Sequence, residues 1–574
     1  MSQAAIQFSL LDYFFFSIVF LVTIGIGLFY AFRNKHHSIY EFLFGGKNLS
    51  ILPVAFSLVA TSISGSSIIG QSMEVYAYGL HNWIYIPMGL LTTLIMQFIF
   101  LPIFFELQLV STFTYFEMRF DRSVKHVASA LYIVTGILLI PLTIYVPALA
   151  FQEVTGINLY LITMIMGSIC IWYTAIGGIR AVVWTDAFQC ILILISGGVI
   201  FIVGLRSVGG ITNVWEALGR GERLTIIKTD FNLETRGSIW SYIFSNMFIS
   251  VYVFGINQSF IQRYVALPDI SKAKKAMWLN TFFCVIIFFL QITIGGIIYT
   301  SYENCDPLSV GIVKKIDQIF PYFVQERASL FEGFNGIFIA GITSAGLSTT
   351  STLLNTIGGT IYSDFVSTRV TDTSERTFSR IIKIISVVVG LIGIALVFVI
   401  ERMGTIFAIT SQCFTLSTVA VFGLFANGMF IPKINARGAK CGVVCAMIVV
   451  GILIVGGLNK NPDPVLPLRT DGCSFLNSTS NVPSFSPMNN SSITKFAPRN
   501  GQNDDFPWIF RINFQFYCLI GIVINLSVGY IVSILSGGNE IKNQKLLVSF
   551  LRKKTPQDLL MNCPEMQRLN ILSK

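Results

Sequence analysis

The chain has 574 residues, of which 53% are hydrophobic and only 12% are charged. Soluble domains carry about 25% charged residues, so this composition excludes an ordinary soluble domain and favours a membrane protein. A mean hydropathy of +0.70 agrees with this. The net charge of +10 is explained below by membrane topology rather than by nucleic-acid binding.

Apolar stretches long enough to cross a bilayer recur along the chain. A transmembrane helix needs about 20 apolar residues, and helices are the structures that satisfy their own backbone in lipid. We therefore predict an all-α membrane protein with about thirteen transmembrane helices. The predicted spans lie near residues 11–32, 51–75, 81–105, 127–149, 157–179, 182–205, 238–262, 276–300, 334–362, 381–400, 404–430, 439–458 and 512–536.

The positions of Lys and Arg predict the orientation. No basic residue precedes the first span, whereas Arg33 and Lys35 follow it, and this step predicts an extracellular N-terminus. An odd number of crossings then places the C-terminus in the cytoplasm. Most of the 39 Lys and Arg residues fall in the predicted inner segments. The basic excess is therefore a topology signal.

The polar segment 459–511 is rich in Ser, Asn and Pro and lies outside in this topology. It contains glycosylation sequons at Asn477, Asn489 and Asn490. Glycosylation requires a lumenal or extracellular loop, so these sequons agree with the orientation predicted from charge.

Two outer cysteines and a basic tail complete the predicted organisation. Cys305 and Cys473 fall in different outer loops, where they either form a disulfide or remain free thiols. We assign residues 1–540 to one transmembrane domain, with core helices at about 51–430, and residues 541–574 to a cytoplasmic tail.

Hydroxyl groups are concentrated in two predicted spans. Residues 343–352 of the ninth span are mostly Ser and Thr, and hydroxyls are costly in hydrocarbon unless their oxygens have a partner. Residues 57–70 of the second span are rich in Ser and Gly, which weaken a helix. A broken membrane helix frees carbonyl oxygens that can hold a cation. Ala345, Ser348 and Thr349 share one helix face, so the two spans predict a Na⁺ site; the alternative is close helix packing through small residues.

Asp186 is a carboxylate early in the sixth span, and Gln189 lies on the same helix face. An acid within the membrane indicates a functional site by default. Asp186 is therefore expected to bind Na⁺, to gate the inner exit, or to pair with Arg180 at the interface.

The seventh span ends with amides in an otherwise apolar segment. Asn257, Gln258 and Gln262 follow Gly255, which is a candidate break. The amides either line a site or join helices through hydrogen bonds. We expect Arg263, the next residue, to anchor the inner boundary.

Several short motifs together resemble the sodium/solute symporter family. The resemblance is closest to the animal branch of sodium-coupled monocarboxylate, multivitamin and iodide transporters, and it covers about residues 10–540. The motifs that carry it are Trp184-Thr185-Asp186, Asn257-Gln258, Gln262-Arg263-Tyr264, Leu347-Ser348-Thr349 with Asn355, Phe42-Leu43-Phe44-Gly45-Gly46, Tyr145-Val146-Pro147, and Cys305-Asp306-Pro307.

This resemblance implies a LeuT-like core of five plus five helices in inverted repeats. It implies a multi-pass plasma-membrane symporter that couples Na⁺ to the import of a small organic anion, such as a monocarboxylate or a vitamin carboxylate. It implies no cofactor beyond the transported Na⁺. The alternatives are a sodium symporter for a neutral solute or iodide, and a transporter-derived, sodium-conducting sensor. An enzyme is not expected, because no metal, phosphate-loop or nucleophile motif occurs in a suitable context.

The resemblance also implies three groups of site residues. The first sodium site is formed by Ala60, Ile63, Ala345, Ser348 and Thr349. A second sodium region involves Thr61, Tyr145, Asp186, Gln189 and Gln258. The solute region contains Ser67, Gln71, Ser250, Phe254, Asn257 and Phe414.

Four positions depart from the family pattern near the solute region. Ala77 stands where relatives usually have Arg, Ser250 where they have Trp, and Phe254 where they have Tyr. Thr418 begins Thr-Val-Ala where Gly-Gly-Pro is usual. Because the sodium residues match, we expect sodium coupling with an altered solute pocket, which either relaxes the anion preference or transports little.

Overall fold

The protein is described by a computed structural model. It covers residues 8–33, 47, 49–109, 111–225, 228–229, 231–327, 332–367, 369, 375–400, 406–457, 463–473, 507–538, 543–548 and 551–552. Within these residues the chain is helical, and the β-structure there is one isolated bridge between Lys228 and Ser238. The predicted all-α architecture is confirmed for this part of the chain. The sequons at Asn477, Asn489 and Asn490 lie outside it.

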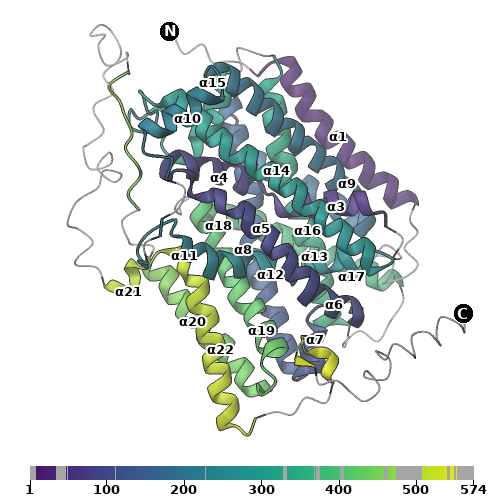
Figure 1. Ribbon diagram of the computed structural model, residues 1–574. Coiled ribbons are helices and arrows are strands. Elements are labelled where there is room, and N and C mark those ends of the chain that lie inside the picture. The colour runs from purple at the N-terminus through teal and green to yellow at the C-terminus, as the bar shows by residue number, and fades with distance from the viewer. Residues whose placement is uncertain are drawn as a thin grey trace, which may run out of the picture.

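Helices follow one another closely along the chain (Figure 1). Those of the first half are α1 (Leu10–Arg33), α3 (Ile51–Ser62), α4 (Gly65–Tyr78), η2 (Leu80–Ile84), α5 (Tyr85–Ile95), η3 (Met96–Phe100), α6 (Leu101–Leu107), α7 (Thr114–Arg119), α8 (Arg122–Thr155), α9 (Leu159–Ser207), α10 (Ile211–Arg220), α11 (Ile239–Ser241), η4 (Tyr242–Asn246), α12 (Met247–Gly255), α13 (Gln258–Val265) and α14 (Ile270–Tyr302). Those of the second half are η5 (Ile316–Gln318), α15 (Ile319–Arg327), α16 (Phe334–Ile361), η7 (Tyr362–Val366), α17 (Glu375–Ile400), α18 (Ile406–Ser417), η8 (Thr418–Phe422), α19 (Gly423–Phe430), α20 (Ala436–Gly457), α21 (Trp508–Arg511), η11 (Phe514–Phe516), α22 (Tyr517–Leu535) and η12 (Gln544–Leu546).

Ten helices in the described chain are long and apolar enough to cross a membrane, and two bent pairs bring the total to as many as twelve. The bent pairs are α3 with α4, at 57°, and the run Ile239–Gly255 with α13, at 42°. These breaks fall in the second and seventh predicted spans, where glycine and hydroxyl residues weaken the helix. The count of thirteen crossings and the orientation of the termini stay predictions.

The helix α9 covers the fifth and sixth predicted spans in one run of 49 residues. The hydroxyl of Tyr173 donates to the Leu347 carbonyl of α16 at 3.2 Å, while Ser196 packs against Gly341 of the same helix. A straight α9 would separate Tyr173 from Ser196 by about 35 Å, whereas Leu347 and Gly341 are only about 9 Å apart along α16. α9 therefore bends back along α16, as two crossings require.

Four π-helical turns occur in the spans of the described chain: η3 between α5 and α6, η4 between α11 and α12, η7 after α16, and η8 between α18 and α19. A π-turn inserts an extra residue into a helix and is frequent at functional sites. The hydropathy of the sequence does not predict these turns.

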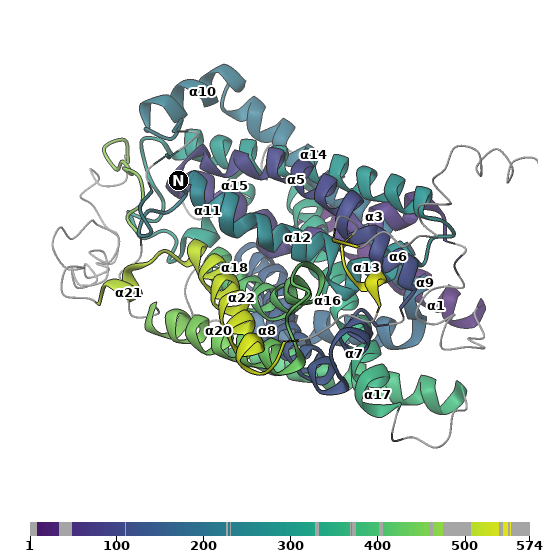
Figure 2. The same ribbon diagram turned by 60° about the horizontal axis from the view of Figure 1, so that its bottom comes forward.

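The broken helix α3–α4 runs through the bundle, and α16 passes beside its break. The C-terminal helices α20 and α22 lie side by side along one flank in both views, away from α1 (Figures 1 and 2). Gly438 and Gly442 of α20 contact Ser533 and Asn525 of α22. Because glycine has no side chain, the two helices can approach each other closely here. Of the long spans in the described chain, the most buried are Phe334–Val366, Ile406–Phe430 and Arg122–Thr155, at 89%, 78% and 61% of their apolar windows, so α16, α18 and α8 lie in the interior.

Candidate functional site

The first broken helix is interrupted by its own hydroxyl groups. α3 ends at Ser62, and Ser64 caps α4. The Ser64 hydroxyl accepts from the Ser67 N–H at 3.3 Å, and the Ser67 hydroxyl accepts from the Ser64 N–H at 3.1 Å. This capping box satisfies the backbone donors that begin α4. The last carbonyls of α3 lose their helical partners at the break, so their oxygens are available to a ligand.

α16 presents hydroxyl groups to this break. The Ser348 hydroxyl lies 2.8 Å from the Ala60 carbonyl oxygen and 3.1 Å from that of Ala345. The Thr349 hydroxyl lies 3.1 Å from the same Ala345 oxygen, and Ile63 belongs to the buried cluster that contains Ala60 and Ala345. The structure thus brings together the five residues expected at the first sodium site. Carbonyl and hydroxyl oxygens at a helix break are the ligand type that Na⁺ takes.

Asp186 lies in a buried network that joins α3, α9, α13 and α16. Its Oδ2 accepts from the Ser57 hydroxyl at 2.8 Å and from Arg263 Nη2 at 2.9 Å. The same Nη2 donates to Thr352 Oγ1 at 2.7 Å, which lies 3.3 Å from Thr61 Oγ1. Two residues of the expected second sodium region, Thr61 and Asp186, are therefore connected through this network.

Arg263 does not lie exposed at the inner boundary, contrary to our expectation. Only 2% of its surface is exposed, and it is the ionic partner of Asp186 in place of Arg180. Its Nε donates to the Ser57 hydroxyl at 2.7 Å and its Nη1 to the Ser259 carbonyl at 2.7 Å. A buried ion pair needs such additional hydrogen bonds because both charges have left water.

The other residues of the expected second sodium region have different surroundings. Gln258 Oε1 accepts from the Thr112 N–H at 2.8 Å, beyond the end of α6, and Tyr145 is buried on α8. Gln189 is fully buried one turn from Asp186, and neither of its amide atoms has a hydrogen-bond partner. The second carboxylate oxygen of Asp186 is also unpaired. Buried unpaired polar atoms are rare, so Asp186 and Gln189 together form a patch suited to a ligand.

A cavity of about 170 Å³ lies between the two broken helices and is completed by α5, α14 and α18. Among the described residues that line it, none carries a charge. Neutral hydroxyl and amide groups alternate with phenylalanines, a lining suited to a small solute with an apolar body and a polar head. The expected solute residues in its wall are Ser67, Gln71, Ser250, Phe254 and Phe414.

A second cavity of about 50 Å³ is lined by residues of both the expected solute region and the expected first sodium site. It is lined by Asn257, the remaining expected solute residue, and by Thr349 of the first sodium site. Ser62, Ser66 and Phe414 line both cavities. The helix break beside the expected first sodium site therefore also forms part of the wall of the larger cavity.

The positions that depart from the family pattern lie in or near this wall. Ser250 and Phe254 line the larger cavity directly. Thr418, at the start of η8, donates its hydroxyl to the carbonyl of the wall residue Phe414 at 2.7 Å. Ala77 lies farther out on α4, where its carbonyl accepts from the Leu466 N–H at 2.9 Å.

A charged cluster near the C-terminal end of α4 has no counterpart among the predicted site residues. Glu74 accepts two hydrogen bonds from Arg236, at 2.7 and 2.6 Å. Arg236 also pairs with Asp463 at 3.2 Å, and its guanidinium lies 3.9 Å from the centre of the Tyr78 ring. His81 Nε2 lies 3.5 Å from Glu74. The cluster ties α4 to two outer segments that are distant in sequence.

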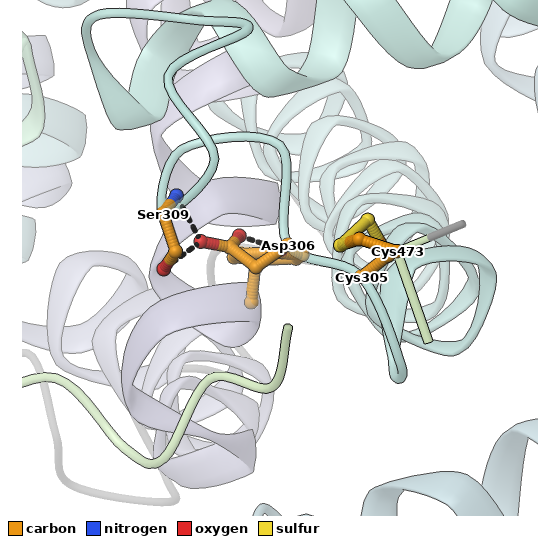
Figure 3. The surroundings of a disulfide bond; sticks show 5 residues. Cys305, Asp306, Ser309 and Cys473 are labelled. Atoms are coloured by element: carbon orange, nitrogen blue, oxygen red, sulfur yellow. Dashed lines mark hydrogen bonds between the residues drawn. A yellow bond between two sulfur atoms is a disulfide. The ribbon is translucent and has the colours of Figure 1, made fainter. Parts of the chain in front are cut away.

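Cys305 and Cys473 form a disulfide (Figure 3). This finding confirms the disulfide alternative over free thiols. Asp306, beside it, accepts from the N–H and hydroxyl of Ser309 at 2.7 and 2.6 Å and from the hydroxyl of Tyr76 on α4. The disulfide thus lies next to a second contact between the outer loops and α4.

Comparison with known proteins places this geometry in context. The model of the sodium:solute symporter family matches residues 42–446. Sodium-coupled monocarboxylate transporter 2 of Danio rerio is 33% identical over 536 residues, which are 92% of this chain and 84% of the relative. The human sodium/iodide cotransporter is 30% identical over 544 residues, which are 92% of this chain and 83% of that protein.

Among solved structures, this chain is similar to a Na⁺-coupled sialic acid symporter in a substrate-bound, outward-open state. The TM-score is 0.74 and the sequence identity is 20%, over 94% of this chain and 100% of the other. At this identity the likeness establishes the fold. It confirms the expected LeuT-like architecture.

Proposed function

Because the chain belongs to the sodium:solute symporter family, we propose that it imports a small organic monoanion, such as a monocarboxylate, across the plasma membrane. The observation that carries this proposal is that the break between α3 and α4 adjoins both the expected first sodium site and the solute cavity. On one side the Ser348 hydroxyl meets the Ala60 carbonyl at 2.8 Å. On the other side Ser62 and Ser66 form part of the solute cavity.

This arrangement supports coupling between the ion and the solute. Na⁺ bound by the carbonyls of Ala60, Ile63 and Ala345 and the hydroxyls of Ser348 and Thr349 would hold α3 and α16 together. The same break shapes the cavity, so ion binding raises the affinity for the solute, and the solute raises the affinity for Na⁺ by the same factor. Alternating access then lets the Na⁺ gradient drive import. The membrane potential adds about 2.3 kcal/mol per charge for each 100 mV.

The nature of the cavity supports a small solute with one negative charge. Its described lining carries no cation, and burying an unpaired charge is costly, so one co-bound Na⁺ would balance one negative charge on the solute but not two. The named relatives include transporters of monocarboxylates and of iodide, both monovalent anions. The aromatic and aliphatic part of the wall, including Phe254 and Phe414, favours an organic anion over iodide because it can bury a hydrocarbon body.

The test is uptake into liposomes that contain the purified protein. Labelled short monocarboxylates, iodide and a neutral sugar are supplied with an inward gradient of Na⁺ or of choline. We expect monocarboxylate accumulation in Na⁺ that is absent in choline. Accumulation of iodide or sugar alone would assign a different solute. Sodium currents without accumulation of any solute would indicate a sodium-conducting sensor and contradict symport.

A further inference from the structure

The polar side chains of Gln515, Tyr242, Asn82 and Gln71 form a row that leads to the solute cavity. The direction of donation along this row is set at Gln515, the end farthest from the cavity. The Gly237 N–H donates to Gln515 Oε1 at 2.8 Å, and a backbone N–H can only donate. Gln515 is a neighbour of the Tyr242 phenol. Its oxygen is already bound by the Gly237 N–H and the Ser241 hydroxyl, and its Nε2 has no hydrogen-bond partner, so the group that Gln515 can still offer Tyr242 is a donor.

Tyr242 continues the same direction of donation toward the cavity. With its oxygen facing a donor, its hydroxyl donates to Asn82 Oδ1, and Asn82 Nδ2 donates to Gln71 Oε1 at 2.7 Å. Asn82 and Tyr242 are almost completely buried, so water does not compete for these bonds. An amide has one accepting end and one donating end. Gln71, whose oxygen is bound to Asn82, therefore turns its Nε2 toward the cavity that it lines, where the phenol of the wall residue Tyr85 is its neighbour.

A second donor lines the same cavity. Asn246 lies one turn after Tyr242, at the end of the π-turn η4. Only 6% of its surface is exposed, and its Nδ2 has no hydrogen-bond partner. A buried amide N–H without an acceptor is costly, so Asn246 points to a ligand that supplies one. The cavity, which lacks charge in its described lining, thus offers neutral donors to its solute.

We propose that Gln515, Tyr242 and Asn82 are positioning residues that hold Gln71 as a hydrogen-bond donor. The cavity then selects small solutes whose polar head only accepts hydrogen bonds, such as a carboxylate, over the matching carboxamide, which also donates. This inference rests on the proposed function and specifies how that site recognises its solute. None of the three positioning residues is part of the cavity wall, so they act through Gln71.

The test compares propionate with propionamide as competing substrates of Na⁺-driven uptake into liposomes. Tyr242→Phe removes the hydroxyl that orients Asn82 while keeping the ring, and Gln515→Leu removes the donor that orients Tyr242. In both variants the Gln71 amide can turn and present its oxygen to the carboxamide. We expect the ratio of kcat/KM for propionate over propionamide to fall about tenfold, as expected for the direction of one buried hydrogen bond. The Na⁺ concentration for half-maximal uptake should stay the same.

Tyr115→Phe is the matched control, because Tyr115 is a buried tyrosine that donates to the Leu546 carbonyl at 3.0 Å, away from the cavity wall. It should keep the wild-type ratio. An unchanged ratio in either Tyr242→Phe or Gln515→Leu, beside a wild type that prefers propionate, would overturn the positioning role alone. A wild type with no Na⁺-driven uptake of either solute would overturn the proposed function itself.

Discussion

The Ser348 hydroxyl lies 2.8 Å from the Ala60 carbonyl oxygen and joins α16 to the break between α3 and α4. Both residues are fully buried. In this geometry the hydroxyl hydrogen points at the carbonyl. If it rotates away, two oxygens become available to one cation, because a hydroxyl both donates and accepts. We therefore propose this contact as the place where a small cation binds.

Thr349→Val tests the contribution of one hydroxyl to this site. The substitution keeps the shape of the side chain and removes one expected oxygen ligand. We expect the Na⁺ concentration for half-maximal uptake to rise about tenfold, which corresponds to about 1.4 kcal/mol, with normal surface expression. The control is Thr293→Val, because the Thr293 hydroxyl also bonds the carbonyl four residues earlier, at 2.7 Å, on an exposed part of α14. Equal Na⁺ activation in both variants would remove Thr349 from the sodium site.

The buried pair of Asp186 and Arg263 should show strong energetic coupling. Arg263→Met leaves the Asp186 carboxylate buried without its partner, which costs about 3–5 kcal/mol. Asp186→Asn with Arg263→Met removes both charges, so the double variant should melt at a higher temperature than Arg263→Met alone. Thermal unfolding of the purified variants measures this. Additive losses of stability would contradict a direct ionic interaction.

Substitution of Asp186 alone tests whether the ion pair has a role in sodium coupling besides its structural role. Asp186→Ala should reduce Na⁺-dependent uptake by more than it reduces the amount of protein at the cell surface, because one carboxylate oxygen is free of protein partners. If Na⁺ activation in Asp186→Ala equals that of wild type, the pair is structural only.

Asp317 predicts a dependence of stability on pH. Burial raises the pKa of this carboxyl from 3.8 to about 6, against the lowering effect of the Ile406 N–H that it accepts at 3.0 Å. Between these two values the folded protein binds more protons than the unfolded chain, so its stability falls as pH rises through this window and stays lower above it. The full effect is about 3 kcal/mol.

Asp317→Asn keeps an acceptor for the start of α18 and removes the charge. We expect a higher melting temperature than wild type at pH 7.5 and little difference at pH 4. A lower melting temperature at pH 7.5 would show that the ionised carboxylate stabilises the fold.

The disulfide should contribute to stability through the long loop that it closes. Cys305 and Cys473 are 168 residues apart, and closing a loop of this length stabilises by up to about 5 kcal/mol on a chain-entropy estimate. Cys305→Ser, Cys473→Ser and the double variant should therefore lower the melting temperature by the same amount. Non-reducing mass spectrometry of protease fragments checks the link itself. A larger loss in the double variant than in either single one would contradict the pairing.

The sequence predicted those features of the site that depend on local composition. The breaks in α3–α4 and before α13 follow from glycine and hydroxyl residues that weaken a helix. The face shared by Ala345, Ser348 and Thr349 follows from helical periodicity. The resemblance to the family supplied Ala60 and Ile63, which have no polar side chain to signal a role.

Contacts between distant segments could not be predicted in this way. The cluster of Glu74, Arg236 and Asp463 joins three segments that are far apart in the sequence, and no motif or periodicity relates them. From the sequence alone, Arg236 resembles any other charged loop residue. The sequence placed Arg263 at the inner end of the seventh span but did not identify Asp186 as its partner. Hydropathy divided α9 into the spans 157–179 and 182–205 and so predicted that the chain reverses there, but it did not predict the contacts of α9 with α16.

The most direct test of the central claim is binding of labelled Na⁺ to the purified protein in excess K⁺. Wild type should bind Na⁺ saturably, and Ser348→Ala with Thr349→Val should weaken that binding at least tenfold without lowering the melting temperature in K⁺ by more than Thr293→Val does. Equal Na⁺ binding in the wild type and the double variant would contradict a sodium site at the break between α3 and α4.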